Sequence, residues 1–212
     1  MGLLQRCVPK LLAASVAALI SLAALGVAAQ LPAPAEVRPD VLVSEVSAAV
    51  IGILKRDAVA GQATDVARLV ETKIVPLFDF QHMTRIAVAR NWRLASAEQQ
   101  AALVAQFRTL LVRTYSSALA SYRDETIEYK PLRLAPAETD VLVRSVVRRP
   151  GAEPLSIDYD MESTPAGWKV YDVKIAGVSM VLTYRETFAA AVRAGGIDGL
   201  IKSLSDKNRA AG

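Results

Sequence analysis

The sequence predicts an α+β domain in which helices pack on one face of a curved antiparallel sheet. The prediction rests on a change of period along the chain. Apolar residues recur every three or four positions up to about residue 122, as expected for helices. Between residues 126 and 175 they alternate with polar residues, as expected for half-buried strands. Short segments rich in Pro and Gly separate the alternating stretches, which favours an antiparallel meander.

The N-terminal segment differs in composition from the rest of the chain. Residues 1–10 contain two bases and no acid, residues 11–29 are almost wholly apolar, and the apolar run ends in small residues. This order of segments is typical of a secretory signal peptide. We therefore expect residues 1–29 to be removed and the mature chain to begin near Gln30. An uncleaved membrane anchor is the alternative, because the apolar run approaches the length that spans a bilayer.

Cysteine and proline positions mark the next boundary. Cys7 precedes the apolar run, whereas a lipoprotein needs its cysteine just after that run, so lipid anchoring is not expected. Residues 30–39 contain three prolines and are expected to form an extended leader. The folded domain is then expected over residues 40–208, with residues 209–212 as a tail.

Four helices are predicted before the change of period, at residues 41–61, 64–76, 78–89 and 96–122. The last is the most clearly marked. Ser96 and Gln99 have the spacing of a capping box, in which each side chain bonds the other residue's backbone N–H. An apolar stripe follows at spacings of three and four residues, formed by Leu103, Phe107, Leu110, Leu111, Thr114, Ala118 and Tyr122.

Four strands and two further helices are predicted after it. The strands are expected at residues 126–134, 140–149, 155–162 and 168–175, and the helices at 178–194 and 197–207. The third strand alternates most cleanly. Its apolar side is formed by Leu155, Ile157, Tyr159 and Met161, and its polar side by Ser156, Asp158, Asp160 and Glu162.

Charge and composition exclude some classes of function. The formal net charge is +4, and loss of the two bases in the signal peptide would lower it to about +2. The chain contains no long run of Lys and Arg, so binding to nucleic acid is not expected.

The sequence offers few candidate residues for catalysis or metal binding. His82 is the single histidine, no histidine–carboxylate zinc motif is present, and the mature chain would have no cysteine. Gly177-Val178-Ser179-Met180-Val181 resembles a nucleophile elbow but lacks its second glycine, and we expect Ser179 to cap a helix instead. Asp158 and Asp160 fall on the polar side of their strand, where a solvated face is the simpler interpretation. We expect no enzymatic activity, no catalytic residue, no bound metal and no cofactor.

Apolar side chains on the inner faces of the long helix and the strands have two interpretations. They form an ordinary core, or the helices stand away from the sheet and leave a pocket for an apolar ligand. Periodicity does not separate the two.

Several stretches together resemble the MlaC family, also called the toluene-tolerance auxiliary component family. They occur in the family's order between residues 41 and 208. The first stretch is Phe78-Asp79-Phe80 with Met83-Thr84-Arg85 and Ala89-Arg90-Asn91-Trp92-Arg93. The second is Phe107-Arg108, Leu110-Leu111, Thr114-Tyr115, Ala118-Leu119 and Tyr122. The third is Gly167-Trp168-Lys169-Val170-Tyr171-Asp172-Val173 with Gly177-Val178-Ser179, Tyr184-Arg185 and Phe188, and the last is Leu200-Ile201 with Lys207-Asn208.

The resemblance implies a periplasmic phospholipid carrier of the pathway that maintains lipid asymmetry. It implies a fold similar to nuclear transport factors, with acyl chains in a cavity between sheet and helices, and phospholipid as cargo. Its implied partners are an inner-membrane ABC transporter with an MCE-type ring and an outer-membrane lipoprotein–porin complex. The alternative is a periplasmic interaction or adaptor protein with a filled core and no ligand.

The residues expected to line such a cavity follow from the predicted faces rather than from a family motif. They are Leu111, Tyr115, Ile157, Tyr159, Met161, Val173, Ile175, Val178 and Val181.

Overall fold

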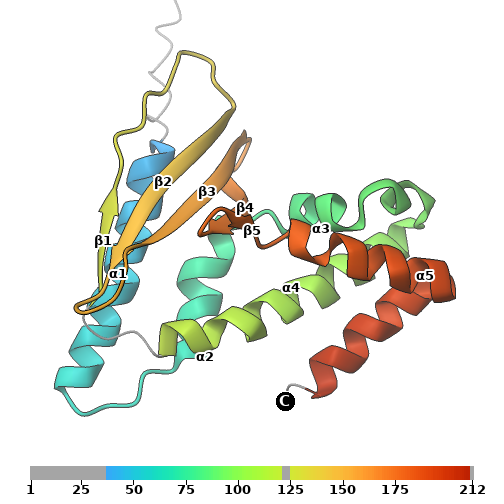
Figure 1. Ribbon diagram of the computed structural model, residues 1–212, viewed down its shortest axis with the longest axis horizontal. Coiled ribbons are helices and arrows are strands. Elements are labelled where there is room, and N and C mark those ends of the chain that lie inside the picture. The colour runs from blue at the N-terminus through green and yellow to red at the C-terminus, as the bar shows by residue number, and fades with distance from the viewer. Residues whose placement is uncertain (1–36, 121–124, 211–212) are drawn as a thin grey trace, which may run out of the picture. The chain divides into compact units, whose positions relative to one another are not determined.

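A five-stranded antiparallel sheet and five α-helices make up the part of the chain that the computed structural model describes, residues 37–120 and 125–210 (Figure 1). The predicted signal peptide, residues 30–36 of the predicted leader and Tyr122 lie outside these residues. The helices are α1 (Pro39–Val59), α2 (Val66–Leu69), α3 (Phe80–Val88), α4 (Ala97–Ala120) and α5 (Arg185–Ala210). α5 consists of two helical segments that meet at a kink at Gly195 and Gly196, where the break between the last two predicted helices was expected. The strands are β1 (Thr126–Tyr129), β2 (Asp140–Arg148), β3 (Leu155–Thr164), β4 (Gly167–Ile175) and β5 (Val178–Ser179). Shorter helical turns are η1 (Val70–Ile74), η2 (Val75–Leu77), η3 (Ala89–Leu94) and η4 (Leu182–Tyr184).

The sheet is a meander. Its strands follow the order β1-β2-β3-β4-β5, and each neighbouring pair is antiparallel. Tyr159 in the middle of β3 lies opposite Val143 of β2 and Val173 of β4. The register of β3 with β4 shifts between Asp160 and Met161, where one strand carries an extra residue. The predicted α+β class with an antiparallel sheet is therefore confirmed.

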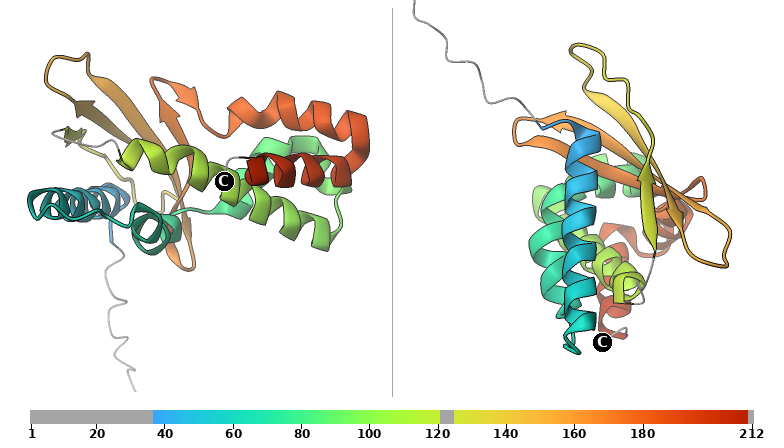
Figure 2. Two further views of the ribbon diagram at one scale, coloured as in Figure 1. Left: turned by 90° about the horizontal axis from the view of Figure 1, so that it is seen from below. Right: turned by 90° about the vertical axis from the view of Figure 1, so that its left-hand side faces the viewer.

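Two hydrophobic clusters hold these elements together. One lies among α3, α4 and α5, where Phe107 packs edge-on against both Tyr184 and Phe188 with ring centres 5.1 Å apart. The other lies between α1 and the sheet and includes Val43 and Met161. Figure 2 shows α1 running beside the sheet while α3 and α5 gather at the other side of the fold. Among the helices of residues 37–120 and 125–210, none combines the length and apolarity needed to cross a membrane.

The helical predictions hold where local signals are strong. The Ser96 backbone N–H donates to Gln99 Oε1 at 3.0 Å, and the Gln99 N–H donates to Ser96 Oγ at 3.2 Å, so the predicted capping box is confirmed. The helix predicted at residues 64–76 begins as α2 and changes pitch through η1 and η2. Pro39, expected in the leader, begins α1, where its missing N–H removes no helical bond.

Two boundaries were predicted wrongly. The strand expected at residues 126–134 ends at Tyr129, because Pro131 has no N–H to continue the ladder. The helix expected from residue 178 begins at Arg185, because the chain first makes a two-residue hairpin turn between β4 and β5. Ala176 and Gly177 form that turn with φ of 49° and 79°, the positive values that tight hairpins require.

Candidate functional site

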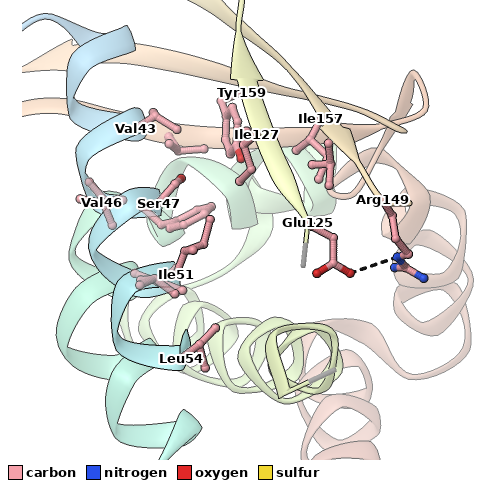
Figure 3. Close-up of a pocket in the computed structure, with 16 residues that line it drawn as sticks. Val43, Val46, Ser47, Ile51, Leu54, Glu125, Ile127, Arg149, Ile157 and Tyr159 are labelled. Carbon is pink, nitrogen blue, oxygen red and sulfur yellow. Dashed lines mark hydrogen bonds and ion pairs between the residues drawn. The ribbon is translucent and has the colours of Figure 1, made fainter. Parts of the chain in front are cut away.

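An apolar cavity of about 290 Å³ lies between α1 and the sheet (Figure 3). Its volume is almost twice that of the roughly 150 Å³ apolar cavity that takes up benzene in an engineered protein. Its walls are formed by Val43, Val46, Ser47, Val50, Ile51 and Leu54 of α1; Ile74, Leu77 and Phe78 beside η2; and Glu125, Ile127, Val147, Arg149, Ile157, Tyr159 and Val170 of the sheet and its margins.

The spacing of apolar residues in α1 explains the helical wall. Val43, Val46, Val50 and Leu54 recur at intervals of three and four residues and therefore share one face of the helix. Val43, near the start of α1, is buried against the sheet, and the face then continues along the cavity. The helix thus contacts the sheet at one end and encloses a space further along.

Hydrogen bonds fasten α1 to the sheet beside this cavity. The Tyr129 hydroxyl of β1 donates to Ser47 Oγ of α1 at 2.7 Å. The Tyr159 hydroxyl lies near Tyr129 and Ser145. Burial raises the pKa of both tyrosines above its ordinary value, so both remain neutral at physiological pH. The bond between Tyr129 and Ser47 satisfies these two hydroxyls, and the rest of the cavity lining is largely apolar.

A second, smaller cavity of about 80 Å³ adjoins the first. It is lined by Val70, Ile74, Val75, Phe78, Phe80, Met83, Leu111, Val112, Tyr115 and Met180. Ile74 and Phe78 line both cavities, so their side chains form the partition between them. The backbone at this partition is held to the sheet, because the N–H of Asp79 donates to the carbonyl of Val170 at 2.9 Å.

One ion pair lies in the wall of the larger cavity. Glu125 precedes β1, Arg149 follows β2, and Arg149 Nε donates to Glu125 Oε1 at 3.0 Å. The Glu125 side chain is 7% exposed and that of Arg149 is 66% exposed. The pair therefore extends from the inside of the cavity to the solvent.

Of the nine residues that were expected to line a cavity, four line one of the two cavities and five do not. Ile157 and Tyr159 line the larger cavity, and Leu111 and Tyr115 line the smaller one. The other five line neither. Met161 and Val173 are buried in the sheet cluster with Ile175 packed against it, Val181 is buried in the helical cluster, and Val178 is 62% exposed.

Sequence reasoning missed the wall formed by α1 and the Glu125–Arg149 pair. The apolar face of α1 was visible as a helical repeat, but a repeat does not say what the helix faces. The sequence signal for the ion pair between Glu125 and Arg149 was weaker. Two opposite charges flank the hairpin of two predicted strands, at positions that the antiparallel register brings together.

The other residues singled out for chemistry have local partners. His82 Nδ1 lies 2.6 Å from Glu162 Oε1, and its ring stacks on Tyr171 with ring centres 4.5 Å apart. Ser179 donates to the buried carboxylate of Asp172 and accepts the N–H of Leu182, the first residue of η4, at 2.9 Å. Within the described residues, no three His, Cys, Asp or Glu side chains gather as a metal site.

The fold and the cavity define an α+β protein whose helices and open antiparallel sheet enclose an apolar pocket. The chain belongs to the MlaC protein family, whose model matches residues 44–206. It is 22% identical over 139 residues to the intermembrane phospholipid transport system binding protein MlaC of Haemophilus influenzae. It is 25% identical over 124 residues to the toluene tolerance protein ttg2D of Pseudomonas putida.

These alignments cover 64% and 58% of this chain, and the chain spans 65% and 57% of the length of the two curated relatives. The comparison with a solved structure covers a larger part of this chain. The phospholipid-binding protein of Ralstonia solanacearum, solved in complex with a phospholipid, is 40% identical with a TM-score of 0.73. That comparison covers 81% of this chain and 97% of the other.

Proposed function

We propose that this protein is a phospholipid carrier whose cavity between α1 and the sheet takes up acyl chains. The observation that carries the proposal is an apolar cavity of about 290 Å³ in a chain 40% identical to a protein solved with a phospholipid bound. An adaptor with a filled core is the alternative, and an open apolar space between α1 and the sheet counts against it.

The energetics of acyl chains explain why such a carrier encloses its cargo. Burying one methylene is worth about 0.8 kcal/mol, and two acyl chains hold on the order of 30 methylenes, so exposing them to water costs roughly 20 kcal/mol. Spontaneous release into water is negligible at that cost. Transfer therefore requires docking on a partner that offers another apolar channel.

The size of the cavity adds a requirement for movement. If roughly 150 Å³ accommodates the six carbons of benzene, 290 Å³ accommodates on the order of a dozen carbons. A diacyl lipid holds more than twice that number in its chains. Loading must therefore widen the space, either by moving α1 away from the sheet or by displacing Ile74 and Phe78 to join the two cavities.

The cellular setting of the proposal follows from the N-terminal segment and the family. A signal peptide at residues 1–29 would direct export to the periplasm, and its cleavage after residue 29 would release the domain at residues 40–208 there. Its proposed partners there are an inner-membrane ABC transporter with an MCE-type ring and an outer-membrane lipoprotein–porin complex. N-terminal sequencing of the periplasmic protein should begin near Gln30, and an intact Met1 on a membrane-bound product would contradict this.

Native mass spectrometry of the purified protein tests the carrier proposal. We expect a mass increment of one or more phospholipids that disappears on organic extraction, and glycerophospholipid in the extract. A protein that has only its apo mass under gentle conditions, and that takes up no lipid from vesicles, would refute the proposal in favour of the adaptor.

A further inference from the structure

We propose that a basic surface at the junction of α3 and η3 docks this protein on anionic phospholipid bilayers. Three arginines, Arg85 of α3 with Arg90 and Arg93 of η3, line one hollow of about 430 Å³ together with Ala89 and Trp92. All three arginines are exposed. None of their guanidinium groups forms an ion pair or a hydrogen bond with another of the described residues. We call these three side chains the arginine surface.

The backbone at Ala89 brings the three arginines to one hollow. Ala89 follows the last residue of α3 with φ of 54° and ψ of −130°, and its N–H donates to the carbonyl of Arg85. A positive φ is uncommon for a residue with a side chain, and it persists only where the surrounding structure holds it. η3 is a 3₁₀ helix, in which residues three apart lie on the same side, so Arg90 and Arg93 project together.

Contacts on the inner side of this segment hold that backbone in place. Trp92 packs against the helical cluster, and its carbonyl accepts a hydrogen bond from Gln100 Nε2 at 3.0 Å. Arg185 of α5 donates to the carbonyl of Ile86 at 3.2 Å. The arginine surface is therefore carried by a segment that is fastened to both α4 and α5.

The positive charge here is not balanced by neighbouring acids. Residues 80–97 contain the three arginines and no Asp or Glu. Elsewhere on the described surface, Arg108 pairs with Glu71 and Lys202 pairs with Asp206. A local excess of one charge attracts partners of the opposite charge, so the arginine surface fits an anionic partner.

Leu94 favours a bilayer as that partner. It follows Arg93 directly and is 73% exposed. Basic residues beside Trp and Leu are typical of protein surfaces that lie on membranes, because lipid phosphates meet the cations and the layer below them takes up apolar side chains. Guanidinium groups bind phosphate oxygens through two parallel hydrogen bonds. An acidic protein would meet the arginines, whereas an anionic bilayer meets both the arginines and Leu94.

The arginine surface lies apart from the cavity wall. Figures 1 and 2 show α3 on the opposite side of the fold from α1. Docking through α3 and η3 would therefore leave α1 and the cavity beside it uncovered. The inference goes beyond the carrier proposal, because it concerns how the protein associates with a membrane and not what the cavity holds.

Co-sedimentation with vesicles measures the association. One set of vesicles is pure phosphatidylcholine, and the other contains equal parts of phosphatidylcholine and phosphatidylglycerol. We expect association with the anionic vesicles alone, and a loss of association as added salt screens the charges. A basic residue near an anionic surface contributes about 1 kcal/mol, so Arg90→Gln combined with Arg93→Gln should weaken association by roughly thirtyfold.

A matched variant controls for net charge. Lys55→Gln combined with Arg56→Gln removes the same charge from exposed positions of α1, and it should keep the wild-type association. Leu94→Ala changes no charge. It should weaken association by roughly fivefold while leaving the salt dependence and the melting temperature unchanged, because the leucine is mostly exposed in the free protein.

The outcomes also separate this inference from the carrier proposal. Wild-type protein that stays in solution with anionic vesicles but carries phospholipid by mass spectrometry would overturn the docking surface and leave the carrier intact. Equal association of the Arg90/Arg93 and Lys55/Arg56 variants would overturn it as well. Binding to polyglutamate through the same arginines, without binding to vesicles, would assign the surface to an acidic protein and refute the bilayer. If the Arg90/Arg93 variant fails to fold, Arg85→Gln and Leu94→Ala give the answer.

Discussion

A carboxylate placed in the wall of the larger cavity should expel acyl chains without unfolding the domain. Ile51 points into this cavity from α1 and is half-buried. In the lipid-free protein, an aspartate at this position can be hydrated, so Ile51→Asp should lower the free energy of unfolding by no more than about 2 kcal/mol. Ala49→Asp is the matched control, because residue 49 is exposed on the same helix and receives the same charge.

The effect on lipid follows from the cost of neutralising the new carboxyl group. Acyl chains cannot solvate a carboxylate, so the group must become protonated when lipid binds, and its pKa rises above the unperturbed value of about 3.9. At pH 7 this protonation costs about 4 kcal/mol, since each pKa unit is worth 1.36 kcal/mol. The penalty corresponds to an affinity for lipid lower by on the order of a thousandfold.

The same argument fixes the direction of the pH dependence. The group has the higher pKa in the lipid-bound state, so binding takes up a proton and is favoured as pH falls. At pH 5 the protonation cost drops to about 1.5 kcal/mol, and lipid retention should partly recover. Native mass spectrometry at the two pH values, with melting temperatures on the same samples, measures both effects. Full lipid retention by Ile51→Asp at pH 7, or loss of the fold, would show that Ile51 does not face the ligand.

Three further changes test other parts of the structure. Tyr159→Asp should leave the domain folded but free of lipid, because Tyr159 also lines the cavity; an unfolded protein would assign this position to the core. Phe78→Ala removes part of the partition between the two cavities and should increase the retention of longer acyl chains, at a loss of up to about 3 kcal/mol in stability. Unchanged chain-length preference, measured by competition between lipids, would show that the cavities do not join. Ser96→Ala removes one half of the capping box and should lower stability by about 1 kcal/mol, or roughly 2–4 °C in melting temperature. A melting curve identical to wild type would mean that solvent replaces the cap.

Elements defined by short-range signals were predictable from the sequence. The capping box at Ser96 and the strand β3 depend on neighbouring residues, and both appear in the structure as expected. The expected contrast between an apolar and a solvated side of β3 does not appear, because residues 156–160 are half-buried on both sides. The turn after β4 shows the limit of such signals. Gly177 is a common helix-flanking residue, but here it takes a positive φ beside Ala176 and closes a hairpin. Ser179 was expected to cap the helix predicted from residue 178, whereas it donates to Asp172 and accepts the N–H of Leu182 after β5.

The sequence could not distinguish core residues from residues that line the cavity, for a physical reason. Ile157, Tyr159 and Met161 fall on one side of β3, and the alternation treats them alike. In the structure, Ile157 and Tyr159 line the cavity, whereas Met161 is fully buried in the sheet cluster. What separates them is where α1 contacts the sheet, and that contact joins residues about a hundred positions apart, such as Val43 and Met161. A local pattern records that a side chain faces inward. Whether it meets another side chain or an open space is decided by the packing of distant elements, and this is also why the ion pair at the cavity wall became visible only in the folded structure.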